Sequence, residues 1–301
     1  MPLETHDTPA PDDDSRTDDA ASGLTRRAFV RSTVLGVGFA AAVQPIAAQT
    51  VVRTDTEGLE AGEVRIPSNG FDMPAYRAQP KGKTNLPVVI VVSEIFGVHE
   101  HIADVARRFA KLGYLAIAPS LFDRQGDATA YADMGKLMSE VVSKVPDAQV
   151  MGDLDATVAW ASAHGGDATR LGVTGFCWGG RITWLFAEHS TSVKAAVAWY
   201  GRLQGAANER QPKHPIDLVA DLHAPVLGLY GGKDEGIPVA SVQAMEAALK
   251  NGTAAAKGSS FVVYPEAGHA FNADYRPSYR ADAAHDGWQR CLAWFRAHGV
   301  A

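Results

Sequence analysis

Short apolar runs and amphipathic segments alternate along the chain from about Glu60 onward. Several of the short runs, such as VVIVVS and VLGLY, are apolar at every position, which is typical of strands covered on both faces. The segments between them repeat apolar positions with the period of a helix. The predicted strands are Glu63–Ile66, Met73–Ala78, Pro87–Ser93, Leu115–Ala118, Leu171–Thr174, Val193–Trp199, Val226–Tyr230 and Phe261–Tyr264. The predicted helices are Ile102–Leu112, Ala128–Val145, Gln149–His164, Gly180–His189, Val239–Lys250 and Tyr279–Ala297.

This alternation predicts an α/β fold with a mostly parallel central sheet and helices on both faces. Asn69-Gly70 joins the first two predicted strands and is a hairpin signal, so that edge of the sheet is expected to be antiparallel. The composition does not change again and no internal repeat occurs, so a single domain is predicted over residues 61–301. Chemistry in such sheets is expected at the carboxyl ends of the strands.

The first 48 residues differ from the rest of the chain. Asp12–Asp19 holds five aspartates and almost no apolar side chains, so this part is expected to be disordered. Arg26-Arg27 then precedes an apolar run over Val34–Val43 that ends in small residues near Ala48. The pattern resembles a twin-arginine signal peptide, and its run is too short for a stable membrane span. We therefore expect contact with the export machinery, cleavage near Ala48, a linker over residues 49–60 and a periplasmic protein. A surface helix with a basic start is the alternative.

Composition and charge exclude little else. The chain has 301 residues, of which 46% are hydrophobic and 21% are charged, and its formal net charge is −6. The Lys and Arg residues are scattered rather than gathered in a stripe, which argues against a nucleic-acid partner. The two cysteines permit at most one disulfide. Cys291 lies in an apolar helical pattern and is predicted to be core, although a bridge to Cys177 is an alternative that would block thiol chemistry.

The segment Gly175-Phe176-Cys177-Trp178-Gly179 follows a predicted strand and opens a predicted helix. Its pattern, glycine two positions before and two positions after a nucleophile, is that of the nucleophile elbow, with cysteine in place of serine. The glycines are needed because side chains there would collide with neighbouring backbone. A phosphate-binding loop is a poorer match, since neither G-x-G-x-x-G nor a following lysine is present. A buried structural cysteine is the remaining alternative.

A thiol nucleophile needs a base and a group that orients the base. Asp234 follows the apolar strand VLGLY and a Gly-Gly turn, and His269 follows the last predicted strand. The chain order Cys177, Asp234, His269 is the nucleophile–acid–histidine order of this fold. Either polar residue alone would be unremarkable, but three in this order at three strand ends predict a catalytic triad.

The segments SEIFGVHEHI, GFCWGG, GGKDEGIP and PEAGHAF together resemble the dienelactone hydrolases, also called carboxymethylenebutenolidases. The resemblance implies the α/β-hydrolase fold and the triad already identified. It implies that Glu94 contacts the thiol, and that the backbone N–H groups of Ile95 and Trp178 form the oxyanion hole. It further implies a gated thiol: an anionic substrate binds an arginine, Glu94 shifts towards that arginine, and the thiol is released to the histidine.

Two arginines hold the substrate carboxylate in the family that the chain resembles. The first is matched by Arg124, in Leu121–Gln125. The second position, four residues after the histidine, is Ala273, and Arg276 is nearby but out of register. The polar segment Gly201–Pro215 is expected to flank the site, which makes Tyr200 a further candidate for contact with substrate.

The sequence therefore predicts a hydrolase that opens a small lactone or ester through a cysteine acyl-enzyme, without a cofactor. One alternative is a broader carboxylesterase or thioesterase for neutral substrates. Another is a non-catalytic thiol sensor on the same fold. A metal site at His99-Glu100-His101 is not expected, because the spacing matches no helical ligand pair, and these residues are expected to cap a helix.

Overall fold

The computed structural model describes residues 52–301, which belong to one compact unit. The predicted export signal and the predicted cleavage site near Ala48 lie outside the described residues. Within the described part of the chain, no helix combines the length and the apolar character that crossing a bilayer requires.

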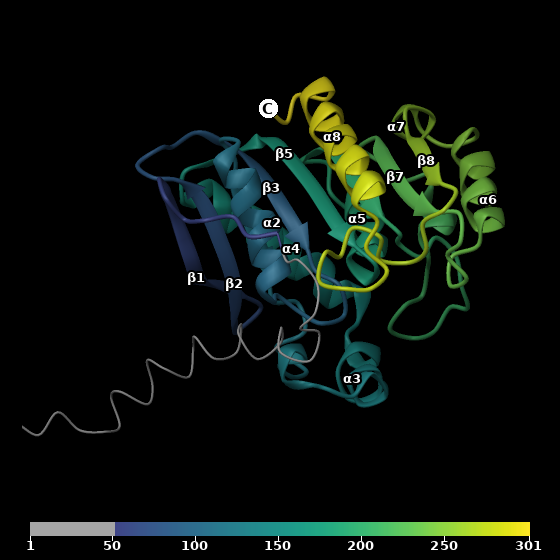
Figure 1. Ribbon diagram of the computed structural model, residues 1–301, viewed down its shortest axis with the longest axis horizontal. Coiled ribbons are helices and arrows are strands. Elements are labelled where there is room, and N and C mark those ends of the chain that lie inside the picture. Colours follow the sequence, from purple (N-terminus) through teal and green to yellow (C-terminus); the bar gives the residue numbers. More distant parts are fainter. Residues whose placement is uncertain (1–51) are drawn as a thin grey trace, which may run out of the picture. The chain divides into compact units, whose positions relative to one another are not determined.

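The described residues form a sheet of eight strands in the order β1-β2-β4-β3-β5-β6-β7-β8 (Figure 1). β3 to β8 run parallel to one another, while β1 and β2 pair antiparallel and β2 also pairs antiparallel with β4. The fold class predicted from the pattern of strands and helices is therefore confirmed. The strands are β1 (Leu59–Ser68), β2 (Phe71–Pro80), β3 (Leu86–Val92), β4 (Leu115–Pro119), β5 (Gly166–Phe176), β6 (Val193–Trp199), β7 (Val226–Gly231) and β8 (Ser260–Tyr264).

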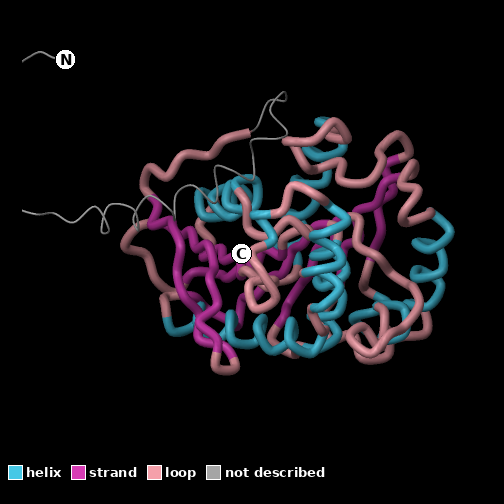
Figure 2. The backbone as a smooth tube through the Cα atoms, turned by 90° about the horizontal axis from the view of Figure 1, so that it is seen from below, coloured by secondary structure: helices cyan, strands magenta, loops and turns pink. Residues whose placement is uncertain are grey.

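Helices cover both faces of this sheet, as Figure 2 shows from a perpendicular direction. α2 and α8 share one face, where Phe109 packs against Trp288 and Phe295. α4 and α5 lie behind the sheet in Figure 1. This arrangement buries the central strands on both sides, which explains their continuous apolar runs. The helices are α2 (Glu100–Lys111), α3 (Met134–Glu140), α4 (Asp147–Ala163), α5 (Trp178–His189), α6 (Val239–Leu249), α7 (Ala254–Lys257) and α8 (Ala281–Ala297).

The hairpin between β1 and β2 forms where Asn69-Gly70 predicts it. Both residues have positive φ, 47° for Asn69 and 75° for Gly70, which is the backbone conformation that this type of two-residue turn requires. Both strands extend beyond their predicted ends, and β5 begins at Gly166 rather than Leu171. The start of β5 pairs with β3 across a register shift at Pro87/Val88, which the apolar pattern did not reveal.

The single helix predicted over Ala128–Val145 is wrong. The segment forms a 3-10 turn over Ala128–Ala130, the short helix α3, and a second 3-10 turn over Val142–Lys144. Asp127 and Asp133 each accept a hydrogen bond from a backbone N–H two or three residues further on, and so begin a new turn. Helical periodicity alone did not account for these two capping side chains.

Candidate active site

Cys177 stands at the corner between β5 and α5 with φ 56° and ψ −115°. Positive φ is costly for a residue that carries a Cβ atom, and such strain is found mainly at functional sites. The flanking glycines make the corner sterically feasible. A Cβ on Gly175 would lie 2.3 Å from the carbonyl oxygen of Gly179, and one on Gly179 would lie 2.3 Å from that of Val92.

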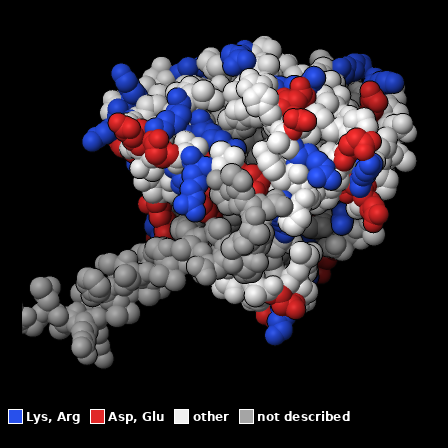
Figure 3. Space-filling model, viewed as in Figure 1, with Lys and Arg blue, Asp and Glu red and all other residues white. Residues whose placement is uncertain are grey.

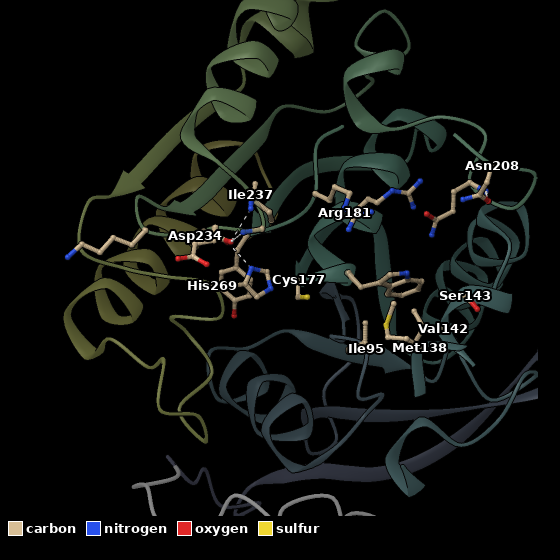
Figure 4. Close-up of a pocket in the computed structure, with 17 residues that line it drawn as sticks. Ile95, Met138, Val142, Ser143, Cys177, Arg181, Asn208, Asp234, Ile237 and His269 are labelled. Carbon is tan, nitrogen blue, oxygen red and sulfur yellow. Dashed lines mark hydrogen bonds and ion pairs between the residues drawn. The ribbon is translucent and has the colours of Figure 1, made fainter. Parts of the chain in front are cut away.

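Asp234 and His269 meet beside this corner. Asp234 follows β7 and is 4% exposed, and its Oδ1 accepts hydrogen bonds from the backbone N–H groups of Gly236 and Ile237 at 3.0 Å each. Its Oδ2 lies 2.7 Å from Nδ1 of His269. A carboxylate only accepts hydrogen bonds, so Nδ1 carries the proton and Nε2 is left for the cysteine. In Figure 4 the imidazole of His269 lies between Asp234 and Cys177.

The pKa of His269 is strongly shifted. Partial burial opposes the charged form, but hydrogen bonds with Asp234 and Cys177 and the charges of these two groups outweigh it and raise the pKa to about 10. His269 therefore holds a proton at neutral pH when a thiolate stands beside it. This is the electrostatic arrangement that stabilises a nucleophilic sulfur.

Cys177 opens into a cavity of about 630 Å³. Figure 4 shows two rows of side chains leading away from the cysteine. One row is mainly apolar and includes Ile95, Met138 and Val142, and the other includes Arg181 and Asn208. The described residues that line the cavity are Ile95, Met138, Val142, Ser143, Cys177, Trp178, Arg181, Tyr200, Arg202, Asn208, Gln211, Lys233, Asp234, Glu235, Gly236, Ile237 and His269.

Glu94 does not line this cavity. It is 3% exposed, and its Oε2 accepts hydrogen bonds from His99 Nε2 at 3.2 Å and from the Tyr275 hydroxyl at 3.3 Å. Burial raises the pKa of Glu94, but the hydrogen bond and charge of His99 and the charges of His101 and Arg276 outweigh it and lower the pKa to about 2. The hydrogen bonds found for Glu94 are with these two side chains rather than with the thiol.

The two predicted oxyanion-hole donors belong to different parts of the chain. The N–H of Trp178 belongs to the first turn of α5, where backbone donors have no carbonyl partner within the helix. Ile95 follows Glu94 at the end of β3, and both Ile95 and Trp178 line the cavity with Cys177. The oxyanion hole that the family resemblance implies therefore remains a prediction, with both of its residues at the cavity that holds Cys177.

Arg124 lies away from the cavity. Its guanidinium donates to Asp153 and to the carbonyl oxygen of Ser68, each at 2.6 Å, and packs on the ring of Phe71 at 4.6 Å. Asp153 is 1% exposed, so Arg124 neutralises a buried carboxylate beside the β1–β2 hairpin. The structure does not bring Arg124 together with the cysteine.

Of the other two candidates for contact with substrate, Tyr200 lines the cavity and Arg276 does not. Arg276 packs on Phe96 at 4.5 Å, and its positive charge contributes to the low pKa of Glu94. Tyr200 lines the cavity, and its ring lies 5.2 Å from that of His269 in an edge contact. Its hydroxyl is buried and has no hydrogen-bond partner among the described residues.

The sequence did not single out several residues that the structure brings to the site. Met138 lines the cavity but belongs to no motif, so only its place in the fold reveals it. Arg181 also lines it, although its guanidinium is bound to both carboxylate oxygens of Asp147 at 2.7 Å. The expected flanking role of Gly201–Pro215 did point towards Arg202, Asn208 and Gln211.

The structure bears on the remaining alternatives. Cys177 and Cys291 are both free thiols, and Cys291 is fully buried, as its helical pattern predicts. His99 occupies the N-cap position of α2 but makes no capping hydrogen bond with its side chain. In the part of the chain that the structure describes, no group of three or more His, Cys, Asp or Glu side chains could hold a metal ion. Figure 3 shows both signs of charge interspersed on the visible face.

Comparisons with known proteins identify the family. Residues 73–299 match the Dienelactone hydrolase family. A protein of Methylorubrum extorquens is 60% identical over 291 residues, covering 96% of this chain and 99% of its own length. A protein of Escherichia coli K12 is 57% identical over 263 residues, covering 87% of this chain and 96% of its own length, and both are named "Putative carboxymethylenebutenolidase".

A solved structure gives the same result. The crystal structure of a Klebsiella pneumoniae protein described as a "Putative Dienelactone Hydrolase" superposes with a TM-score of 0.76 and 61% sequence identity, and it covers 79% of this chain and 98% of its own. The matched region includes the sheet from Met73 in β2 onward and every residue of the cavity. The chain is therefore a hydrolase that belongs to the dienelactone hydrolase family, with the α/β-hydrolase fold.

Proposed function

We propose that this protein hydrolyses a small lactone or ester through a thioester formed on Cys177. One observation carries the proposal: the strained cysteine shares its cavity with a histidine whose far nitrogen is held by a buried aspartate 2.7 Å away. A sensor thiol would need neither the aspartate nor the histidine. The arrangement instead contains a nucleophile, a proton carrier and a group that orients the carrier.

Acylation begins when the Cys177 thiol passes its proton to Nε2 of His269, which leaves a thiolate beside the imidazolium. The sulfur attacks the carbonyl carbon, and the oxygen becomes an oxyanion that accepts hydrogen bonds from the N–H groups of Ile95 and Trp178. When the tetrahedral intermediate collapses, the C–O bond breaks and His269 Nε2 gives its proton to the leaving oxygen. In a lactone this oxygen stays tethered, so the product is a ring-opened thioester.

Deacylation reverses the roles. The now neutral His269 takes a proton from water, and the resulting hydroxide attacks the thioester carbonyl. The C–S bond breaks, the thiolate is restored beside the imidazolium, and the carboxylic acid product loses its proton to solvent. Asp234 keeps the imidazole oriented through both halves and stabilises its charge.

The ion pairs of the basic side chains in and near the cavity indicate whether the substrate carries a carboxylate or is neutral. Arg181 is paired with Asp147 and Lys233 with Glu266, while no ion pair is found for Arg202 among the described residues. We propose that Arg202 is the cavity cation that can meet a substrate carboxylate. The engagement of Arg124 with Asp153 supports the alternative, a broader carboxylesterase or thioesterase for neutral substrates.

Dienelactone hydrolysis, followed by ultraviolet absorbance, tests the proposal when the protein is compared with Cys177→Ala and Cys291→Ala. Cys291 offers a matched control because it is a buried free thiol outside the cavity. Turnover should fall at least about 10³-fold in Cys177→Ala and persist in Cys291→Ala. Equal turnover with and without Cys177 would refute the cysteine mechanism. If no protein opens the lactone, uncharged esters test the alternative.

We also propose that the protein is exported through the twin-arginine route to the periplasm. The paired Arg26-Arg27 and the short apolar run Val34–Val43 support this. Replacing both arginines by lysine should leave the full-length chain in the cytoplasmic fraction. A shorter, periplasmic chain from that variant would contradict the proposal.

A further inference from the structure

A buried polar cluster lies behind the cysteine, built around Glu94. Its Oε2 accepts both hydrogen bonds found for this carboxylate, from His99 and Tyr275. All three side chains are buried, with exposed fractions of 3%, 3% and 7%. A buried carboxylate without donors would bind a proton, so two donors on one oxygen favour the ionised form.

His99 is itself held in place. Its ring lies edge-on to that of Tyr275 at 4.9 Å and stacks with that of His101 at 6.1 Å. His101 in turn is hydrogen-bonded through Nδ1 to Asp274 Oδ1 at 2.9 Å. The imidazole of His99 therefore has neighbours that fix its plane, and its Nε2 is directed at Glu94. Such secondary contacts are how proteins fix the orientation of a functional side chain.

The second oxygen of the carboxylate is the informative one. Among the described residues, no donor lies within hydrogen-bonding distance of Glu94 Oε1, although the atom is buried. The Tyr200 hydroxyl is a second buried group that has no hydrogen-bond partner among the described residues. Burial first, and then the charges of Glu94, Tyr275 and Cys177, raise the pKa of Tyr200 well above its usual value. Glu94 and Cys177 therefore both lie close enough to the Tyr200 phenol for their charges to act on it.

We propose that His99 and Tyr275 are positioning residues, which hold Glu94 as a carboxylate through Oε2 and leave Oε1 to accept a hydrogen bond from the Cys177 thiol. This rests on the proposed role of Cys177 as nucleophile. Any turn of the Glu94 carboxylate from its present position would break these two buried hydrogen bonds. His99 at the start of α2 and Tyr275 after β8 then keep Glu94 negatively charged beside the resting thiol. This charge is present before any substrate binds.

Charged and titratable groups from four parts of the chain surround Glu94 or the residues that act on it directly. α2 and its N-cap supply two histidines, the segment after β8 supplies one acid, one phenol and one guanidinium, and the ends of β5 and β6 supply the thiol and a second phenol. These groups are His99, His101, Asp274, Tyr275, Arg276, Cys177 and Tyr200.

The test compares alkylation of Cys177 by iodoacetamide in the native chain and in His99→Phe, from about pH 5 to about pH 8. Mass spectrometry of the peptide that carries Cys177 separates it from Cys291. Without the His99 donor, burial of Glu94 is less opposed, and its carboxyl binds a proton within this range. The ratio of the variant's alkylation rate to the native rate should then be at least about threefold higher at the acid end of the range than at the alkaline end. At the acid end a neutral Glu94 no longer repels the thiolate.

Two further variants identify the group that titrates. In a Glu94→Gln background the pH dependence of the ratio should vanish, because no carboxyl is left to titrate. His189→Gln is the matched control: this surface histidine pairs with Asp155, so its ratio should stay constant. A constant ratio for His99→Phe, or a pH dependence that survives Glu94→Gln, would overturn the proposal.

Tyr275→Phe keeps the test decisive if His99→Phe fails to fold. It removes the second donor, preserves the ring, and should produce the same change at smaller size. His99→Gln, which retains a donor at the end of its side chain, should restore the native profile in part. Because alkylation reports on the thiol without turnover, this outcome is independent of whether Cys177→Ala abolishes hydrolysis.

Discussion

The residues on the two sides of Cys177 come from different kinds of structure: strand ends on one side, and a short helix and a loop on the other. Asp234 and His269 on one side follow β7 and β8, and the backbone around them is fixed by close approaches and hydrogen bonds. On the other side Met138 and Arg202 come from a short helix and a polar loop. Bond making and breaking needs positions held to fractions of an ångström, which strand ends provide. The far wall only has to fit a substrate, so loops are sufficient there.

The largest expected effect falls on the triad side. His269→Gln removes the group that carries the proton in both half-reactions, so kcat should fall about 10³-fold. His189→Gln is the control, because this histidine lies on the surface of α5. Stopped-flow or steady-state hydrolysis of an activated ester measures both variants. If kcat falls less than tenfold in His269→Gln, then His269 does not carry the proton in the reaction.

Gly179→Ala tests whether the elbow tolerates a side chain. The new Cβ would lie 2.3 Å from the carbonyl oxygen of Val92 and 2.5 Å from that of Ser93, both backbone atoms that cannot move aside. We expect the free energy of unfolding to fall by about 3 kcal/mol, as for severe overpacking. Gly268→Ala is the matched control, since its nearest neighbour is 3.7 Å away. Urea denaturation that gives equal values for both would contradict this account of the corner.

Arg202→Gln tests the loop side. An ester that carries a distal carboxylate should lose affinity, with KM raised about tenfold, because one charge-assisted hydrogen bond is lost. An uncharged ester of the same length should keep its KM, and kcat should change little for either. Arg65→Gln, on the distant edge strand β1, is the control. Equal changes for the two esters would remove Arg202 from substrate recognition.

Met138→Ala should have a smaller effect. Met138 is 41% exposed although it lines the cavity, so it presents an apolar surface to a bound acyl chain. Loss of that contact should lower kcat/KM about threefold for a six-carbon acyl ester and leave acetate esters unchanged. Met134, on the same helix, is exposed but does not line the cavity and provides the control. A chain-length profile unaffected by Met138→Ala would show that α3 plays no part in recognition.

The smallest expected effect is a dependence of stability on pH that belongs to the triad alone. The pKa of His269 is raised to about 10, so its charged form stabilises the folded chain below the unfolded-state pKa, and this contribution is lost as pH rises towards 10. Differential scanning calorimetry should show Tm falling more steeply over this range in the native chain than in His269→Gln. Parallel curves would argue against the raised pKa.

Most of the fold and part of the site followed from the sequence. The apolar runs predicted all eight strands, and Asn69-Gly70 predicted the hairpin. The order of Cys177, Asp234 and His269 was enough to predict that they would meet, because parallel strands present their carboxyl ends at one edge. The helix over Ala128–Val145 was predicted incorrectly, since two aspartate caps outweigh the periodic pattern there.

The sequence by itself determined which residues stand at the strand ends, because strand and helix periods and the glycines of the elbow are local properties of the chain. Only the tertiary structure decided which charged and polar side chains pair with one another in and around the site. Arg124 occupies the position that the family resemblance predicted, yet Asp153, 29 residues away in sequence, holds its guanidinium. Glu94 likewise follows its strand as expected, but His99 and Tyr275 choose which of its oxygens is free. Pairing of buried charges depends on distances between distant segments, and no local pattern encodes them.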